Sequence, residues 1–351
     1  MAVRLGLVGC GAIGQKHLQA LVHLDEGQLT ATADSDPERA AAAALPFDAA
    51  SFSSAHELFE SGVVDAVVIA TPSGLHADLA MEAMEQGLDV LVEKPLALSI
   101  EVARMLTQFA EDAGVILAVT HFNRLLAAPA ELLSLVREGA LGTLLSGGVA
   151  VRWARPQAYF DEASWRGTRA LDGGMLFNQA VHALDLAVEV FGPAAEVFCY
   201  ADTKTHAIES EDTVAASVRF RGGALVTVAA TTSVPRVNLE ERLTVVGSEG
   251  VAVLGPTAAE LSVLRTADPD RDARVLAALA ERPAAPTWAS HQQALEDFLE
   301  SVATRRPPTL SAASTLDALA LVDALTRSAA ERRPVSLDGS EQSEASHDQG
   351  T

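Results

Sequence analysis

Two kinds of apolar segment alternate along the first third of the chain. Short runs of consecutive apolar residues, such as Val3 to Val8, are followed by longer segments in which apolar residues recur at helical spacing, such as Ile13 to Leu24. The predicted strands are residues 3–8, 29–33, 63–70, 90–92 and 115–119, and the predicted helices are residues 13–24, 37–45, 75–86 and 100–113. Near-continuous apolar strands that alternate with helices indicate a parallel sheet covered on both faces. We therefore expect an α/β, doubly wound domain over residues 1–121.

The order of the elements changes after residue 121. Several strands follow one another there, separated by turn signals such as Arg221-Gly222-Gly223. The predicted strands are residues 144–153, 197–201, 213–220, 224–232, 241–246 and 250–254, and the predicted helices are residues 129–138, 174–191, 289–304 and 312–332. This succession predicts an α+β second domain with an antiparallel or mixed sheet over residues 122–335. Residues 336–351 are acidic and polar without apolar periodicity, which predicts a disordered tail.

The composition narrows the class of protein. The chain has 351 residues, of which 49% are hydrophobic and 21% charged, and this favours two globular domains. A formal net charge of −22 repels a phosphate backbone, so we expect no nucleic-acid partner. No apolar stretch approaches the roughly 18 residues of a transmembrane helix, so we expect no membrane partner. The two cysteines, Cys10 and Cys199, lack metal-ligand spacing and predict reduced thiols in a cytoplasmic protein.

A glycine-rich turn joins the first predicted strand to the first predicted helix. The segment Gly9-Cys10-Gly11-Ala12-Ile13-Gly14 fits the pattern G-x-G-x-x-G. In this pattern the glycines permit a tight turn, close approach of the backbone to a pyrophosphate, and close packing of helix on strand. The turn therefore predicts a dinucleotide site at the start of the helix.

An acidic residue follows this turn at the distance that such a site requires. Asp34 ends the second predicted strand, about 20 residues after the last glycine. A carboxylate there can accept hydrogen bonds from the adenosine ribose and repel a 2′-phosphate, so NAD is favoured over NADP. Two observations leave alternatives open: Asp34 could instead cap the helix that begins at Pro37, and the hydroxyl of Ser35 could contact a phosphate.

Two further segments carry groups that can transfer protons. Lys94 lies in Glu93-Lys94-Pro95, directly after a predicted strand, where open parallel sheets bind ligands. Its ammonium can donate to a substrate oxygen, although a lysine in this position is also commonly just solvated. On the predicted helix 174–191, Asn178 and His182 share one face with Asp185. His182 is either a proton carrier or a core histidine bonded to Asn178 or Asp185.

Taken in order along the chain, these motifs resemble the Gfo/Idh/MocA oxidoreductase family. The resemblance also includes Ala70-Thr71-Pro72, His76 and Gly173-Gly174, and it covers nearly the whole chain apart from the tail. It implies a Rossmann domain followed by an α/β domain with a large open sheet. It further implies that Lys94 and His182 form the acid–base pair, and that Thr71, Pro72 and His76 border the nicotinamide. A cis peptide bond before Pro95 is also implied.

The chain departs from the common pattern of that family at two positions. Many relatives carry an aspartate where this chain has Asn178, completing a Lys-Asp-His triad, so His182 here lacks a charged orienting group. Met175 stands in place of a third glycine. The Asn178-Gln179 pair, preceded by Tyr159 and Trp165-Arg166-Gly167-Thr168, is similar to members that act on nucleotide-linked sugar acids.

An arginine cluster precedes the predicted catalytic helix. Arginine side chains suit carboxylate or phosphate, and aromatic faces suit rings, so the cluster raises the hypothesis that the substrate carries an anionic group. The alternative is that these arginines pair with the nearby acids Asp161, Glu162 and Asp172. The cluster contains Arg152, Arg155, Arg166 and Arg169, interleaved with Trp153, Tyr159 and Trp165.

The sequence and the resemblance together predict an NAD(H)-dependent oxidoreductase that transfers a hydride to or from a CH–OH or C=O carbon of a sugar, cyclitol or sugar acid. The expected catalytic residues are Lys94, His182 and Asn178. The expected cofactor-binding residues are Gly9, Gly11, Ala12, Ile13, Gly14, Asp34, Ser35, Thr71, Pro72, His76, Glu93, Lys94, Trp165 and Arg166. The expected substrate-binding residues are Lys94, Tyr159, Arg166, Asn178, Gln179 and His182.

Several alternatives and further expectations accompany this prediction. A dinucleotide-binding sensor or repressor without turnover is one alternative, and an NADP-linked reductase is another. No metal ion is expected, because the histidines are dispersed along the sequence. The open sheet favours a homodimer or homotetramer.

Overall fold

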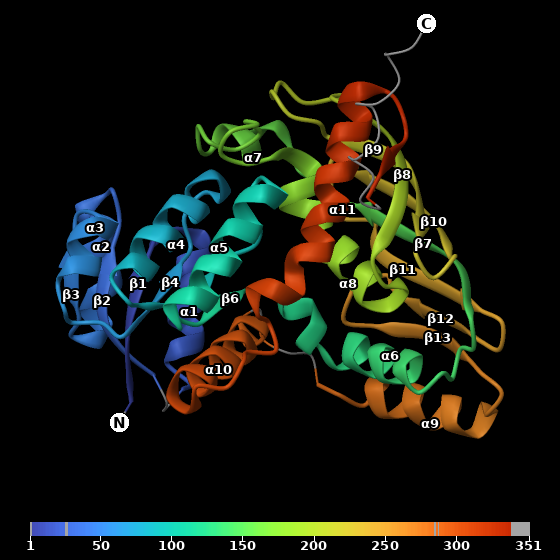
Figure 1. Cartoon of the computed structure of the whole chain (residues 1–351), viewed down its shortest axis with the longest axis horizontal. Helices are drawn as coiled ribbons and strands as arrows, with labels where there is room; N and C mark the ends of the chain where they lie inside the picture. The colour runs from blue at the N-terminus through green and yellow to red at the C-terminus, as the bar shows by residue number, and fades with distance from the viewer. Residues whose placement is uncertain (1, 25–26, 284–285, 287, 338–351) are drawn as a thin grey trace, which may run out of the picture.

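Two β-sheets organise the chain in the computed structural model, which describes residues 2–24, 27–283, 286 and 288–337 (Figure 1). The first sheet has six strands in the order β3-β2-β1-β4-β5-β6, and all of its strand pairs are parallel. The second sheet has eight strands in the order β13-β12-β11-β7-β10-β9-β8-β14 and is mixed, because only β7 and β10 pair in parallel. The predicted combination of a doubly wound parallel sheet and an α+β domain with an open sheet is confirmed.

The first sheet is built from short, fully apolar strands separated by helices. Its strands are β1 (Val3–Val8), β2 (Gly27–Ala33), β3 (Ala50–Phe52), β4 (Ala66–Ile69), β5 (Asp89–Val92) and β6 (Leu117–Val119). Its helices are α1 (Ala12–Leu21), α2 (Pro37–Ala44), α3 (Ala55–Glu60), α4 (His76–Glu85) and α5 (Ile100–Ala113). Strands β4 and β5 are buried along their whole length, which is why they contain almost no polar residue. The strand order reverses between β1 and β4, and ligands bind in the crevice at such a point.

The second sheet is covered by helices on one face. Its strands are β7 (Leu144–Arg152), β8 (Ala194–Asp202), β9 (Thr213–Phe220), β10 (Leu225–Thr231), β11 (Glu240–Gly247), β12 (Val251–Leu254), β13 (Leu261–Arg265) and β14 (Val335–Ser336). The helices of this part are α6 (Ala127–Arg137), α7 (Gln157–Asp161), α8 (Val181–Phe191), α9 (Pro269–Ala280), α10 (Ala289–Thr304) and α11 (Ala312–Glu331). Along β9 every second residue is buried, as expected for a sheet with one covered and one open face. Helix α11 packs against β8 and α8 and also against α5, so it lies between the two sheets (Figure 1).

One predicted helix has a different geometry from the one expected. Residues 174–191 are not a single α-helix: Met175–Ala180 form a π-helical segment, η4, and α8 follows it. The backbone amide of Leu176 donates to the Glu211 carboxylate, and that of Met175 donates to the Glu211 carbonyl. Both amides belong to the first turn of the segment, where a helix offers them no carbonyl acceptor, so Glu211 caps the start of η4. π-Helical turns of this kind are frequent at functional sites.

Some other boundaries also differ from the prediction. Strand β3, helix α3, strand β13 and helix α9 were not predicted. Strand β3, for example, is a three-residue edge strand in which only Phe52 is half-buried, so it is too short to show an apolar pattern. Ser336, predicted to begin the tail, instead pairs with Glu196 in the second sheet. Leu337, also in the predicted tail, donates its backbone amide to the carbonyl oxygen of Ala195, and the remaining residues 338–351 lie outside the described residues.

A helix from the C-terminal part of the chain completes the core of the first sheet. Helix α10 packs against α1 and β1 and lies beside the six-stranded sheet, well away from α9 (Figure 1). Its side chains Leu295, Phe298 and Leu299 are fully buried in one cluster with residues of β1 such as Leu5. Helix α10 is therefore positioned to contribute side chains to a site on the first sheet. Within the described residues, none of the helices has both the length and the hydropathy of a membrane span.

Candidate active site

A large cavity lies where the carboxyl ends of the first sheet meet the second part of the chain. Its volume is about 1110 Å³, and its wall is formed by the loops after β1, β2, β4 and β5 on one side and by residues around α7, η4 and α8 on the other. Every residue predicted to act in catalysis or to bind cofactor or substrate lines this cavity, with the exception of Gly14. The lining residues that were not among these predictions include Arg39, Ser53, Phe122, Trp153, Arg155 and His291.

The three glycines of the turn meet different steric demands. Gly9 has a φ of +91°, and a Cβ there would lie 2.6 Å from the carbonyl oxygen of Ala70. A Cβ on Gly14 would lie 2.1 Å from the carbonyl oxygen of Gly9, so Gly14 is required for packing of α1 on the turn. A Cβ on Gly11 would meet no heavy atom within 4 Å, because this position opens into the cavity. The turn thus leaves open the space that a pyrophosphate needs at the start of α1.

The carboxylate of Asp34 is held by two backbone amides, one of which belongs to the glycine turn. Its Oδ2 accepts a hydrogen bond of 2.8 Å from the backbone amide of Cys10, and its Oδ1 accepts one of 2.9 Å from the amide of Asp36. Asp36 itself caps α2, with its side chain accepting from the amides of Glu38 and Arg39. The interpretation of Asp34 as the helix cap is therefore wrong. The Arg39 guanidinium lies 3.3 Å from Asp34 Oδ1 and also lines the cavity.

Lys94 connects the two parts of the chain across the cavity. Its Nζ donates to the backbone oxygen of Asn178 at 2.7 Å and to the side-chain Oδ1 of Asn178 at 3.2 Å. The amide nitrogen of Asn178 in turn donates to the Asp172 carboxylate. Burial lowers the pKa of Lys94 from its ordinary value, against the opposing charges of Glu93 and Asp172. The peptide bond between Lys94 and Pro95 is cis, as the resemblance implied.

His182 is not bonded to either of the residues that a purely structural role would use. Its Nδ1 is buried and has no hydrogen-bond partner among the described residues. Asp185, which was expected to share its face, instead receives a hydrogen bond of 2.7 Å from Nε of the buried Arg124, and it does not line the cavity. The interpretation of His182 as a core histidine bonded to Asn178 or Asp185 is therefore wrong. Burial, followed by the nearby charge of Lys94, holds the pKa of His182 well below 6.5, so the ring is neutral at neutral pH.

The four arginines of the cluster have separate environments. Arg152 pairs with Glu240, and Arg169 does not line the cavity. Arg166 pairs with Glu162, as the alternative hypothesis expected, and its guanidinium lies 4.1 Å from the centroid of the Tyr159 ring. Arg152 and Arg166 are therefore paired with carboxylates, and Arg169 lies away from the cavity.

Arg155 is the one arginine of the four that lines the cavity and has no carboxylate partner within the described residues. It donates to the side-chain oxygens of Asn238 and Gln179, both at 3.3 Å, and to its neighbour's carbonyl oxygen at 2.9 Å. Its guanidinium lies 5.0 Å from the centroid of the Trp153 ring and 5.4 Å from that of Tyr159. A cation held beside two aromatic rings in this way is suited to an anionic group on a ligand.

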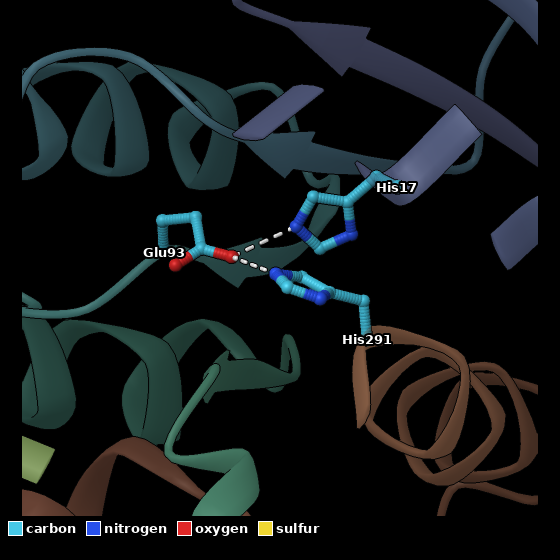
Figure 2. A group of neighbouring side chains, drawn as sticks. All are labelled: His17, Glu93 and His291. Atoms are coloured by element: carbon cyan, nitrogen blue, oxygen red, sulfur yellow. Dashed lines mark hydrogen bonds and ion pairs between the residues drawn. The ribbon is translucent and has the colours of Figure 1, made fainter. Parts of the chain in front are cut away.

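A buried group of ionisable side chains adjoins Lys94. Nε2 of His17 lies 2.9 Å from Oε1 of Glu93, and Nε2 of His291 lies 3.7 Å from the same oxygen (Figure 2). The three atoms lie within 4.8 Å of one another, a spacing at which a shared cation is sterically feasible. The sequence does not reveal this group, because its histidines come from α1 and α10 at opposite ends of the chain.

Comparison with known protein families also finds a dinucleotide-binding domain in the first part of the chain. A model of an oxidoreductase family with an NAD-binding Rossmann fold matches residues 3–121, and a model of the GFO/IDH/MocA C-terminal domain matches residues 130–253. The chain belongs to the Gfo/Idh/MocA oxidoreductase family. Its first domain is the NAD-binding domain of that family, as the glycine turn and Asp34 predicted.

Individual relatives in the Gfo/Idh/MocA family differ in the part of the chain that they match. The rhizopine catabolism protein MocA of Rhizobium meliloti is 32% identical over 58% of this chain and 61% of its own length. The chain likewise spans only 52% and 54% of two other curated relatives. The myo-inositol 2-dehydrogenase of Thermotoga maritima is 28% identical over 96% of this chain and 99% of its own length.

A solved dehydrogenase structure is similar to nearly the whole of this chain. The WlbA dehydrogenase of Bordetella pertussis, whose structure contains NADH and UDP-GlcNAcA, superposes with a TM-score of 0.87. It is 32% identical in sequence, and the match covers 96% of this chain and 99% of that one.

The residues present fit an NAD molecule in this Gfo/Idh/MocA chain. Gly11 leaves the floor of the cavity open, and Asp34 stands at one end with its carboxylate already fixed. Several residues of the cavity wall also carry a buried polar atom without a partner among the described residues, including Oγ1 of Thr71, Nε of Arg166 and Nδ1 of His182.

Proposed function

We propose that this chain is an NAD(H)-dependent oxidoreductase that transfers a hydride between the nicotinamide and a CH–OH or C=O carbon of a sugar-like substrate. The observation that carries the proposal is the convergence of Lys94 and His182 on the cavity that contains the glycine turn. Lys94 follows a strand of the first sheet, whereas His182 belongs to α8 against the second sheet. A substrate held between these two side chains has a proton donor and a proton acceptor within one enclosed site.

The residues of the first domain hold the cofactor in this proposal. Backbone amides at the start of α1 bind the pyrophosphate beside Gly11, and Asp34 accepts hydrogen bonds from the adenosine ribose. Thr71, Pro72 and His76 border the nicotinamide, with the His76 ring held between the carbonyl oxygens of Thr71 and Pro95 at 2.9 and 2.7 Å. NAD, when bound, supplies the hydride acceptor or donor.

Lys94 and His182 control the proton. In the oxidative direction, the neutral His182 accepts the hydroxyl proton of the substrate as its carbon loses a hydride. The Lys94 ammonium donates to the same substrate oxygen and stabilises the charge that develops there. Asn178, anchored by Asp172, orients the ammonium rather than the histidine, which explains how an asparagine serves at this position.

Arg155 supports the narrower proposal that the substrate is an acidic, nucleotide-linked sugar. Its guanidinium faces the cavity between Trp153 and Tyr159, where aromatic faces suit a ring and the cation suits a carboxylate. The similar WlbA dehydrogenase binds UDP-GlcNAcA, a sugar acid of this kind. The test is a panel of neutral sugars, cyclitols, uronic acids and nucleotide-sugar acids, with NADH formation followed by absorbance. Turnover of a nucleotide-sugar acid supports the proposal, whereas cofactor binding without turnover of any substrate favours the sensor alternative.

Substitution of Arg155 by methionine is expected to lower kcat/KM for the acidic substrate by about 10- to 100-fold, because a charge-assisted hydrogen bond is lost. The loss for the neutral analogue that lacks the carboxylate is expected to stay within about threefold. The matched control is Arg152→Met, since Arg152 pairs with Glu240 and does not line the cavity. Equal losses for the acidic and neutral substrates in Arg155→Met contradict the assignment.

Substitution of Asp34 by serine is expected to shift the cofactor preference toward NADP by about tenfold or more, measured as the ratio of the two kcat/KM values. The change removes the carboxylate that repels a 2′-phosphate and leaves the Arg39 guanidinium, which lies 3.3 Å from Asp34 and 3.4 Å from Asp36, with one carboxylate partner fewer. Asp36→Ser is the control, because serine also caps helices and position 36 caps α2. An unchanged preference in Asp34→Ser argues against the ribose contact.

We also propose a cytoplasmic homo-oligomer that associates through the open face of the second sheet. Exposed apolar side chains support this, including Tyr200 on β8 and Leu225 on β10, with exposed fractions of 66% and 53%. Light scattering coupled to gel filtration is expected to give the mass of a dimer or tetramer. A monomer mass at micromolar concentration contradicts this proposal.

A further inference from the structure

Glu93 is held in the cavity wall by side chains from distant parts of the chain. It directly follows β5, while His17 comes from α1 and His291 from α10. Figure 2 shows both imidazole rings directed at one carboxylate oxygen of Glu93. The contacts are a hydrogen bond of 2.9 Å from His17 Nε2 and an approach of 3.7 Å by His291 Nε2, and the backbone amide of Lys94 adds a 3.3 Å hydrogen bond to the other oxygen.

This environment keeps Glu93 ionised and leaves its charge uncancelled by His291. Burial opposes ionisation, but the hydrogen bond from His17 and the positive charge of Lys94 outweigh it and hold the pKa of Glu93 well below its ordinary value. Burial lowers the pKa of His291 to about 4, so its ring is neutral at neutral pH. Nδ1 of His17 and of His291 has no hydrogen-bond partner among the described residues, whereas metal-ligating histidines are normally oriented by such a partner. The geometry is therefore that of a hydrogen-bonded carboxylate rather than a prepared metal site.

The position of this charge matters for the cofactor. Glu93 and His291 line the same cavity as Lys94 and His182. Asp34 and the glycine turn occupy the adenosine and pyrophosphate end, so the nicotinamide ring belongs at the end where Lys94 and His182 lie. A buried carboxylate there acts on the ring through a medium in which charges interact more strongly than in water.

We propose that Glu93 tunes the redox poise of the bound cofactor: its fixed negative charge stabilises the cationic ring of NAD⁺ relative to the neutral ring of NADH. The inference rests on the proposed function, since it requires the nicotinamide to lie beside Lys94. The ammonium of Lys94 acts in the opposite sense, but it is present in every variant below, so a change at position 93 isolates the contribution of Glu93. Glu93 is a positioning and tuning residue here, with no role in proton transfer.

The test measures the dissociation constants of NAD⁺ and NADH separately by calorimetry and fluorescence, without substrate. In Glu93→Gln, which removes the charge and keeps the shape, the Kd of NAD⁺ is expected to rise about tenfold relative to that of NADH. Glu93→Asp keeps the charge and is expected to retain most of the wild-type ratio. Glu85→Gln, an equal change of net charge at the far end of α4, is expected to leave the ratio unchanged.

Two variants of His291 test the effect of the Glu93 charge without altering Glu93 itself. They serve if Glu93→Gln folds poorly. His291→Lys introduces an ammonium beside the carboxylate and is expected to shift the ratio in the same direction as Glu93→Gln, whereas His291→Gln is expected to leave it within about twofold. Equal weakening of both cofactors in Glu93→Gln and His291→Lys indicates a structural role and overturns the inference alone. Stoichiometric metal in the purified protein also overturns it, because a cation would neutralise Glu93. Failure of the wild-type protein to bind either cofactor overturns the proposed function and this inference together.

Discussion

Replacement of His182 by asparagine is expected to lower kcat by a factor of about 10² to 10⁴, while the Kd of NADH stays within about twofold. The side chain lines the cavity on the wall that faces the first domain, and its Nδ1 makes no hydrogen bond within the described residues. Its removal therefore takes away a proton acceptor without breaking a hydrogen bond of Nδ1, and it also removes the ring contact with Phe122, whose centroid lies 5.4 Å from that of His182. Lys94→Met is a less clean test, because the ammonium also holds the two oxygens of Asn178 and so supports the η4 segment.

The pH profile sharpens this prediction. The group acts as a base when it is deprotonated, and burial holds the pKa of His182 well below 6.5. The kcat/KM of the wild type for alcohol oxidation is therefore expected to be independent of pH near neutrality, and to fall only in more acidic buffer, below the ordinary range of histidine, where His182 becomes protonated. Steady-state rates of the wild type and of His182→Asn across pH, with the exposed His56→Asn as control, measure this effect. Retention of kcat in His182→Asn assigns the proton to another group.

The fold could be predicted where local pattern and tertiary environment agree. Strand β4 is buried on both faces, so its sequence is continuously apolar and identifies it without further information. The π-helical segment η4 could not be predicted, because its apolar spacing is that of an ordinary helix. The residue that caps its start, Glu211, lies far along the chain and accepts a hydrogen bond from the amide of Leu176. Likewise, the edge strand β3 is too short to show an apolar pattern.

The candidate site could be predicted only where one segment carries the whole motif. The glycine turn and Lys94 are recognisable because strand, turn and chemistry are adjacent in sequence. The alternative of Asp34 as the helix cap is wrong by two residues: Asp36, which directly precedes Pro37, caps α2, while Asp34 accepts from the amide of Cys10. Arg155 could not be distinguished from Arg152 and Arg166 by sequence, because the pairing of those two arginines depends on where Glu240 and Glu162 lie in space. His291 gave no signal, because it reaches the cavity from a helix that packs back onto the first domain.

Replacement of Gly11 by valine is expected to weaken NADH binding by about 10² or more without lowering the thermal stability of the protein. The backbone at Gly11 is extended, with φ −72° and ψ −160°, so a β-branched residue fits its conformation. A Cβ there meets no protein atom within 4 Å and projects into the cavity beside the start of α1. The added side chain therefore competes with the pyrophosphate and with nothing else. Fluorescence titration with NADH and a thermal melt measure the two effects.

Substitutions at two other glycines, one in the same turn and one remote from it, serve as controls for Gly11→Val. Gly14→Ala brings a Cβ to within 2.1 Å of the Gly9 carbonyl oxygen, so it is expected to lower the melting temperature as well as the affinity. Gly222→Val, in the turn between β9 and β10, where the nearest atom to a Cβ is 3.8 Å away, is expected to alter neither. If Gly11→Val binds NADH as the wild type does, the pyrophosphate does not lie against this turn, and the orientation from which the roles of Asp34, Lys94 and Glu93 follow is wrong. If only Gly11→Val separates binding from stability, the cavity is oriented with its adenosine end at Asp34 and its reactive end between Lys94 and His182.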